Sequence, residues 1–87
     1  MEKIKVAING YGVIGKRVAD AVMLQDDMEL TGVCDVVSDW RINMAVSKSY
    51  PVYGFDQPVN NQMKEAGIPV MGSLDDMLQS ADIVIDC

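Results

Sequence analysis

Residues 8–17 read Ile8-Asn9-Gly10-Tyr11-Gly12-Val13-Ile14-Gly15-Lys16-Arg17, and this stretch decides the fold of the chain. Its three glycines have the spacing Gly-x-Gly-x-x-Gly, which is typical of the turn between a strand and a helix in dinucleotide-binding domains. In that arrangement Gly10 can take a tight turn, Gly12 lets a phosphate approach the backbone, and Gly15 lets the helix pack close to its strand. The stretch therefore predicts a strand, a turn and a helix built around a phosphate group.

The residues on either side supply the context that glycine spacing alone lacks. Apolar residues precede the turn at the period of a strand and follow it at the period of a helix. They are Ile4, Val6 and Ile8 before the turn, and Ile14, Val18, Ala21 and Val22 after it. We therefore predict a strand over residues 3–9 and a helix over residues 11–25.

A carboxylate stands where the second strand is expected to end. Asp35 follows a predicted strand over residues 28–34, about twenty residues after the last glycine of the turn, where dinucleotide-binding domains carry an acid. There it would accept hydrogen bonds from an adenosine ribose and repel a 2′-phosphate. The backbone N–H groups of Gly12, Val13 and Ile14 would face a pyrophosphate at the positive end of the helix dipole. The pattern indicates a site for NAD and disfavours NADP, with a turn that binds nothing as the alternative.

The remainder of the chain alternates between predicted helices and strands. Residues 50–55 read as a third strand, and the unbroken apolar run of residues 83–85 reads as a fourth, buried on both faces of a parallel sheet. Helices are predicted from the cap Ser38-Asp39, from Asp56 up to Gly67, and from a capping-box pattern that opens at Ser73. Their apolar faces are predicted to hold Ile42, Ala45 and Val46; Val59, Met63 and Ala66; and Leu74, Met77 and Leu78.

The predicted fold class is α/β, half of a Rossmann-type doubly wound parallel sheet with flanking helices. Right-handed crossovers place its strands in the order 3-2-1-4. A complete doubly wound domain has six strands. We therefore expect residues 1–87 to be an incomplete dinucleotide-binding domain, with the catalytic domain absent from this chain and an uncovered fourth strand.

Composition narrows the function classes. The formal net charge is −6, so the chain offers no basic face for nucleic acid. It has no histidine, and its two cysteines, Cys34 and Cys87, are far apart, which argues against a Cys-His pair, a disulfide scaffold and a metal site. Asp75 and Asp76 are interpreted as helix-cap charges. No apolar run is long enough to cross a membrane, and we expect a cytoplasmic protein.

Trp40 and Arg41 allow two interpretations. In the first, Val36, Val37 and Trp40 wall an adenine while Arg41 contacts a phosphate. Alternatively, Trp40 packs its helix and Arg41 is solvated, which we favour because aromatic residues at helix starts mostly serve packing.

Several segments together carry a resemblance to a known family. They are residues 5–22, with Asn9-Gly10-Tyr11-Gly12-Val13-Ile14-Gly15-Lys16-Arg17 at the centre, Gln25-Asp26-Asp27-Met28-Glu29-Leu30-Thr31-Gly32-Val33, Ala66-Gly67-Ile68 and Asp82-Ile83-Val84-Ile85-Asp86. On these residues the chain resembles the amino-terminal part of the archaeal-type (type II) glyceraldehyde-3-phosphate dehydrogenases. The resemblance implies an NAD(P)-binding domain in which the backbone at Val13 and Ile14 holds the pyrophosphate. It also implies a homo-oligomer for the full-length protein.

Two departures from that family bear on function. Many archaeal relatives place Thr-Lys after the second strand and accept NADP, whereas this chain has Cys34-Asp35, which favours NAD. The family's nucleophilic cysteine lies in a Ser-Cys-Asn-Thr-Thr segment, with a histidine further on, and neither Cys34 nor Cys87 matches it. The resemblance therefore implies the coenzyme-binding part of a phosphorylating dehydrogenase of glycolysis and gluconeogenesis, with no catalytic residue among those present.

Two alternatives stay open. One is a stand-alone, non-catalytic half-Rossmann module that binds a nucleotide and associates through its exposed fourth strand. The other is a different dehydrogenase or reductase with the same opening, such as a homoserine dehydrogenase-like or dihydrodipicolinate reductase-like protein. The run Asn9-Gly10-Tyr11-Gly12 speaks against the second.

Overall fold

In the computed structural model, which describes residues 3–36 and 40–87, the strands form one parallel sheet in the order β3-β2-β1-β4. The elements along the chain are β1 Ile4–Asn9, α1 Val13–Met23, β2 Met28–Asp35, α2 Trp40–Ser47, β3 Val52–Gly54, α3 Gln57–Glu65, α4 Leu74–Ser80 and β4 Ile83–Asp86. The predicted fold class and strand order are confirmed. The predicted cap Ser38-Asp39 and the side chains of Trp40 and Arg41 lie outside what the structure describes.

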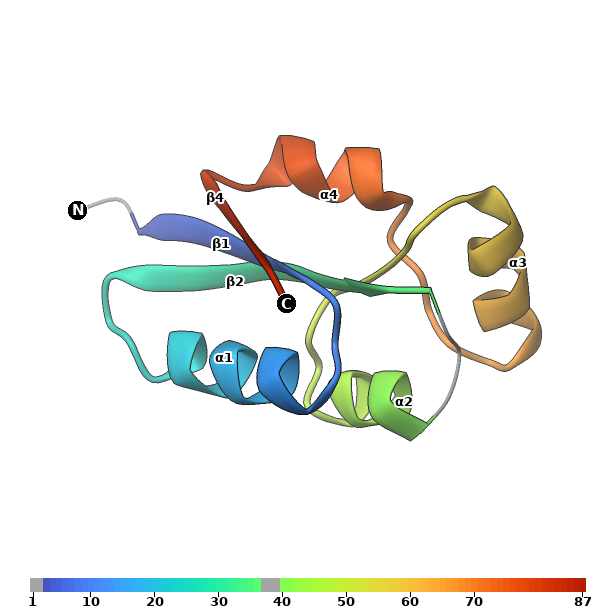
Figure 1. Cartoon of the computed structure of the whole chain (residues 1–87), viewed down its shortest axis with the longest axis horizontal. Coiled ribbons are helices and arrows are strands. Elements are labelled where there is room, and N and C mark those ends of the chain that lie inside the picture. Colours follow the sequence, from blue (N-terminus) through green and yellow to red (C-terminus); the bar gives the residue numbers. More distant parts are fainter. Residues whose placement is uncertain (1–2, 37–39) are drawn as a thin grey trace.

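Helices cover both faces of the sheet (Figure 1), with α1 and α2 on one side and α4 on the other. Alternate residues of β1 serve the two sides, as the period of a strand requires. Val6 and Ile8 belong to the larger apolar core, which includes residues of α1 and α2, whereas Ala7 packs in a smaller cluster with Cys34 and Met77. The carboxyl ends of β1 and β2 are thereby held between apolar clusters on the two faces of the sheet. Helix α1 begins shortly after the carboxyl end of β1.

A bulge in β2 sets the register of the two central strands. Val6 pairs with Leu30 and Ala7 pairs with Gly32, so that Thr31 is the extra residue. The Thr31 hydroxyl donates to the Val6 carbonyl at 3.3 Å. A Cβ at Gly32 would lie 2.5 Å from the ring of Tyr53, which confirms the close approach expected of a glycine within a strand.

Helix α1 begins two residues later than predicted and buries only part of the predicted apolar period. The buried residues are Gly15, Ala19 and Val22, whereas Ile14 is 69% exposed and Ala21 is exposed. Of the four apolar residues at helical period, Val22 is buried and Val18 packs against the core, whereas Ile14 and Ala21 are exposed. The helix lies so close to β1 that small residues occupy the contact, and the buried Tyr11 ring fills the space before the helix begins.

The two edges of the sheet differ. The segment after α3 covers β3, because the Met71 N–H donates to the Val52 carbonyl at 2.8 Å and the Gly54 N–H donates to the Gly72 carbonyl at 3.1 Å. On β4, Ile83 is 49% and Val84 37% exposed. The prediction that this strand is buried on both faces is therefore wrong for the described residues. Within these residues, β4 pairs with β1.

Smaller corrections concern the later helices. Ala66 and Leu78 are exposed, although both were predicted to be buried. Ala66 is the residue that ends α3, and Leu78 follows the buried Met77 on the outer side of α4. The predicted stop of α3 is confirmed, since Gly67 follows it with φ of +80°.

Candidate dinucleotide-binding site

Two of the three glycines in the turn are required by the chain itself. Gly10 has φ of +100°, and a Cβ on it would lie 2.7 Å from the carbonyl oxygen of Cys87. A Cβ on Gly15 would overlap the carbonyl oxygen of Gly10. Gly10 therefore makes the turn and Gly15 lets α1 pack against it, as the spacing predicts.

Nothing within the described chain requires a glycine at position 12. Gly12 has φ of −88° and ψ of −157°, an extended conformation that any residue adopts. A Cβ on Gly12 would have no neighbour within 4 Å. The side of the turn in front of Gly12 is therefore open, which is the space that an approaching phosphate needs.

The amino end of α1 is left without a cap of its own. Gly12 is the N-cap residue, and the first main-chain bond of the helix runs from the Lys16 N–H to the Gly12 carbonyl at 2.9 Å. Over residues 3–36 and 40–87, no side chain caps this end, and its first turn contains no acid. The first N–H groups of a helix need an acceptor from elsewhere, and here they are free to bind an anion.

A shallow pocket of about 280 Å³ lies at this end of the helix. It is lined by Gly12, Val13, Ile14, Gly15 and Cys87. Val13 and Ile14 are 63% and 69% exposed, so this end of α1 lies at the surface. Four of the six predicted site residues thus line one pocket, while Gly10 shapes the turn beneath it.

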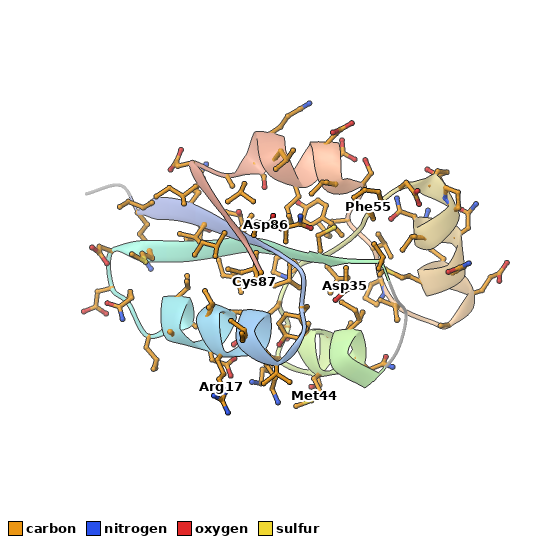
Figure 2. All side chains as sticks on the ribbon, in the orientation of Figure 1. Arg17, Asp35, Met44, Phe55, Asp86 and Cys87 are labelled. Carbon is orange, nitrogen blue, oxygen red and sulfur yellow. The ribbon has the colours of Figure 1, made fainter. Side chains whose placement is uncertain are left out.

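Asp35 reaches the same turn from the carboxyl end of β2 (Figure 2). Its Oδ2 accepts the backbone N–H of Tyr11 at 2.9 Å, and its Oδ1 accepts the N–H of Val36 at 2.6 Å. Each carboxylate oxygen has two lone pairs, so both retain capacity for a ribose hydroxyl. The structure therefore joins Asp35 to the glycine-rich turn through the backbone of Tyr11.

The two cysteines lie in contrasting surroundings. Cys34 is fully buried, and burial, helped by the charge of Asp35, raises its pKa to about 11, so the thiol stays protonated at neutral pH. The Cys34 side chain therefore serves as part of the core. Cys87 is exposed and lines the pocket, a role that sequence reasoning missed although the order 3-2-1-4 places the end of β4 beside the turn.

Neither Asp76 nor Arg17 lines the pocket at α1. Asp76 caps α4, since its carboxylate accepts the Ser73 N–H at 2.9 Å, as predicted. Arg17 points outward from α1 (Figure 2). Among the described residues, no group of three or more metal-ligating side chains comes together, and no helix has the length and apolar character to span a membrane.

Comparison with known proteins places the chain in a family. The model of the family described as "Dihydrodipicolinate reductase, N-terminus" matches residues 4–87. The chain belongs to this family. The name is that of one of the reductases considered as alternatives above, and the match covers the whole turn, both strands that hold it and the pocket.

The individual proteins that the chain resembles are named glyceraldehyde-3-phosphate dehydrogenases and not dihydrodipicolinate reductases. The glyceraldehyde-3-phosphate dehydrogenase of Archaeoglobus fulgidus is 53% identical over 88 residues, covering 100% of this chain and 25% of the relative. Those of Methanococcoides burtonii and Methanosarcina mazei are 51% and 45% identical over 87 and 89 residues, covering 100% of this chain and 26% of each relative. The predicted resemblance to archaeal glyceraldehyde-3-phosphate dehydrogenases is confirmed, and the chain spans about a quarter of their length.

The family and the relatives together bear on the cofactor. Both support a nicotinamide dinucleotide, without distinguishing NAD from NADP. The open turn, the uncapped helix end and the carboxylate at the end of β2 fit such a ligand.

Proposed function

We propose that these residues form the coenzyme-binding part of a phosphorylating glyceraldehyde-3-phosphate dehydrogenase, and that they bind NAD in preference to NADP. The bound nicotinamide accepts a hydride in that reaction. The residues present bind and orient the coenzyme, and the nucleophile that the family uses is not among them. Relatives named glyceraldehyde-3-phosphate dehydrogenase are about half identical in sequence over the whole chain, which supports this proposal over a stand-alone module.

The observation that carries the proposal is the open position at Gly12. Gly12 is a glycine that the described fold does not need, it is the N-cap of a helix that has no side-chain cap, and it lines an open pocket together with Val13 and Ile14. Backbone N–H groups at a helix end bind a pyrophosphate without help from a cationic side chain. A chain of net charge −6 can therefore bind an anionic coenzyme locally.

The preference for NAD rests on Asp35. Its carboxylate is at the end of β2, where the acid of this fingerprint accepts the hydroxyls of the adenosine ribose. A 2′-phosphate placed there would meet a negative charge. We further propose a cytoplasmic, homo-oligomeric full-length protein that acts in glycolysis and gluconeogenesis, as expected from the resemblance.

Calorimetric titration with NAD and NADP tests the proposal, with Gly12→Val as the matched variant. Because a Cβ at position 12 has open space and the backbone there is extended, the valine protein should keep its circular dichroism spectrum and a cooperative unfolding transition, with a loss of about 1 kcal/mol from the poorer N-cap residue. Its side chain would occupy the phosphate position, and NAD binding should be lost. Equal affinity of the unmutated protein for NAD and NADP contradicts the role of Asp35, and NAD binding by Gly12→Val contradicts the site.

A further inference from the structure

We propose that Asp35 is also a positioning residue, which holds the pyrophosphate-binding end of α1 in place through the backbone of Tyr11. The identity of the ligand in this inference rests on the proposed function. The positioning itself rests on the hydrogen bonds of Asp35 and on how the turn is anchored.

The bond to Asp35 continues the contact of β1 with β2 past the end of β1. The last paired residues are Asn9 and Cys34, and the Gly10 N–H then donates to the Cys34 carbonyl at 2.7 Å. One residue further on, the Tyr11 N–H donates to the Asp35 carboxylate at 2.9 Å. Beyond the turn at Gly10, the acceptor from β2 is thus a charged side chain and not a main-chain carbonyl, and such charge-assisted bonds are stronger than neutral ones.

Tyr11 is held on two sides. Its side chain is fully buried in the main core, and its N–H is bound to Asp35. The next residue is Gly12, the N-cap of α1, so the direction of the first free N–H groups follows from the placement of Tyr11. The carboxylate is itself oriented by the 2.6 Å bond from the Val36 N–H.

One side chain would therefore serve both recognition of the ribose and the geometry of the phosphate site. Replacing Asp35 by a neutral residue removes repulsion of a 2′-phosphate and also loosens the turn. Such a variant loses discrimination between the coenzymes, but affinity for the pyrophosphate common to NAD and NADP falls as well. Asp35→Asn keeps an oxygen that can accept the Tyr11 N–H and should retain more of the turn than Asp35→Ala.

Amide hydrogen exchange of the whole protein without coenzyme tests the positioning directly. Asp82→Ala is the matched control, because the Asp82 carboxylate accepts the N–H of Lys5 at 3.0 Å, the same kind of bond at the opposite end of β1. The Tyr11 amide should exchange about tenfold faster in Asp35→Ala, the effect of losing one bond to a charged group, and remain as protected in Asp82→Ala as in the parent. Unchanged protection of Tyr11 in Asp35→Ala overturns the proposal.

Should Asp35→Ala fail to fold, Asp35→Asn decides the same question. Its neutral amide oxygen is a weaker acceptor, so the Tyr11 amide should exchange several-fold faster than in the parent protein. Protection equal to the parent overturns the proposal.

Titration with an NAD analogue that lacks the 2′ and 3′ hydroxyls of the adenosine ribose separates the two roles of Asp35. The analogue cannot use the ribose contact, so Asp35→Ala should weaken it several-fold only if the carboxylate also holds the turn, and Asp82→Ala should leave it unchanged. Equal affinity of the parent and Asp35→Ala for the analogue overturns the positioning role and leaves the proposed function intact. Failure of the parent to bind NAD overturns the proposed function, while the exchange measurement still decides the positioning.

Discussion

The amino ends of α1 and α4 satisfy the same physical requirement in opposite ways. Both helices leave their first N–H groups without partners inside the helix. At α4, Ser73 and Asp76 form a capping box, and Asp75 adds a second acid in the first turn. At α1 the cap is Gly12, with neither a capping side chain nor an acid in the first turn among the described residues.

The amino end of α3, like that of α4, is capped by a side chain. Asp56 is its N-cap, and the carboxylate accepts the Val59 N–H at 3.1 Å. At α3 and α4 the chain therefore caps the helix with its own side chains. Among the helix ends whose caps the structure describes, that of α1 is bare, and it coincides with the open turn and the pocket. The difference supports the proposal that the acceptor for α1 is a ligand.

The largest effect is expected from Gly15→Ala, which tests whether the bare end of α1 depends on the shape of the turn. A Cβ at position 15 would overlap the Gly10 carbonyl oxygen, so the free energy of unfolding should fall by about 3 kcal/mol, the upper part of the usual range for overpacking. Urea unfolding measures this. Gly12→Ala is the control, and its loss should stay below about 1 kcal/mol because its Cβ has open space. Similar losses in both variants would contradict the separate roles of the two glycines.

Gly12→Asp converts the end of α1 into the type found at α3. The new carboxylate can accept an N–H of the first helical turn, so the protein should gain a few tenths of a kcal/mol in stability. NAD affinity should fall about a hundredfold, because the pyrophosphate meets a negative charge as well as an occupied position. Thermal unfolding and calorimetry measure the two effects. Gly12→Asn supplies a cap without the charge, and a gain in coenzyme affinity in either variant would contradict the comparison.

The smallest effect is expected at the capped ends. Asp56→Ala removes the acceptor of the Val59 N–H and should lower the free energy of unfolding by about 1 kcal/mol. NAD affinity should not change, because Asp56 lies at the start of α3 and outside the pocket at α1. Urea unfolding and titration of the same preparation provide both numbers. A loss of NAD affinity in Asp56→Ala would show that the two kinds of helix end are not independent.

Much of the fold follows from local patterns. The apolar period around Ile8, the Gly-x-Gly-x-x-Gly spacing and the Ser73–Asp76 pattern each predict a feature that the structure contains. These features depend on neighbours in sequence, because strand period, helix period and capping are properties of short segments. The order of the strands follows from the handedness of crossovers, which is the same for nearly all parallel sheets.

The stripe of α1 that faces the sheet could not be predicted from its apolar residues. Ile14 continues the helical period but is exposed, while Gly15 and Ala19 are buried. The reason is the close approach of the helix to β1, which favours small residues at the contact. Apolar period shows that a helix has a preferred side, whereas the distance between helix and sheet decides which residues can occupy it.

The sequence by itself determined the class of fold, the place of the turn, and Asp35 as the acid at the end of β2. Tertiary structure decided that Asp35 binds the Tyr11 N–H, that Cys87 lines the pocket, and that Gly12 alone among the three glycines of the turn has open space around it. Tyr11 and Asp35 are 24 residues apart in the chain, and their contact depends on the register of β1 against β2. That register is set by the bulge at Thr31. Because almost every residue type has a backbone N–H, the identity of residue 11 does not reveal that its N–H makes this contact.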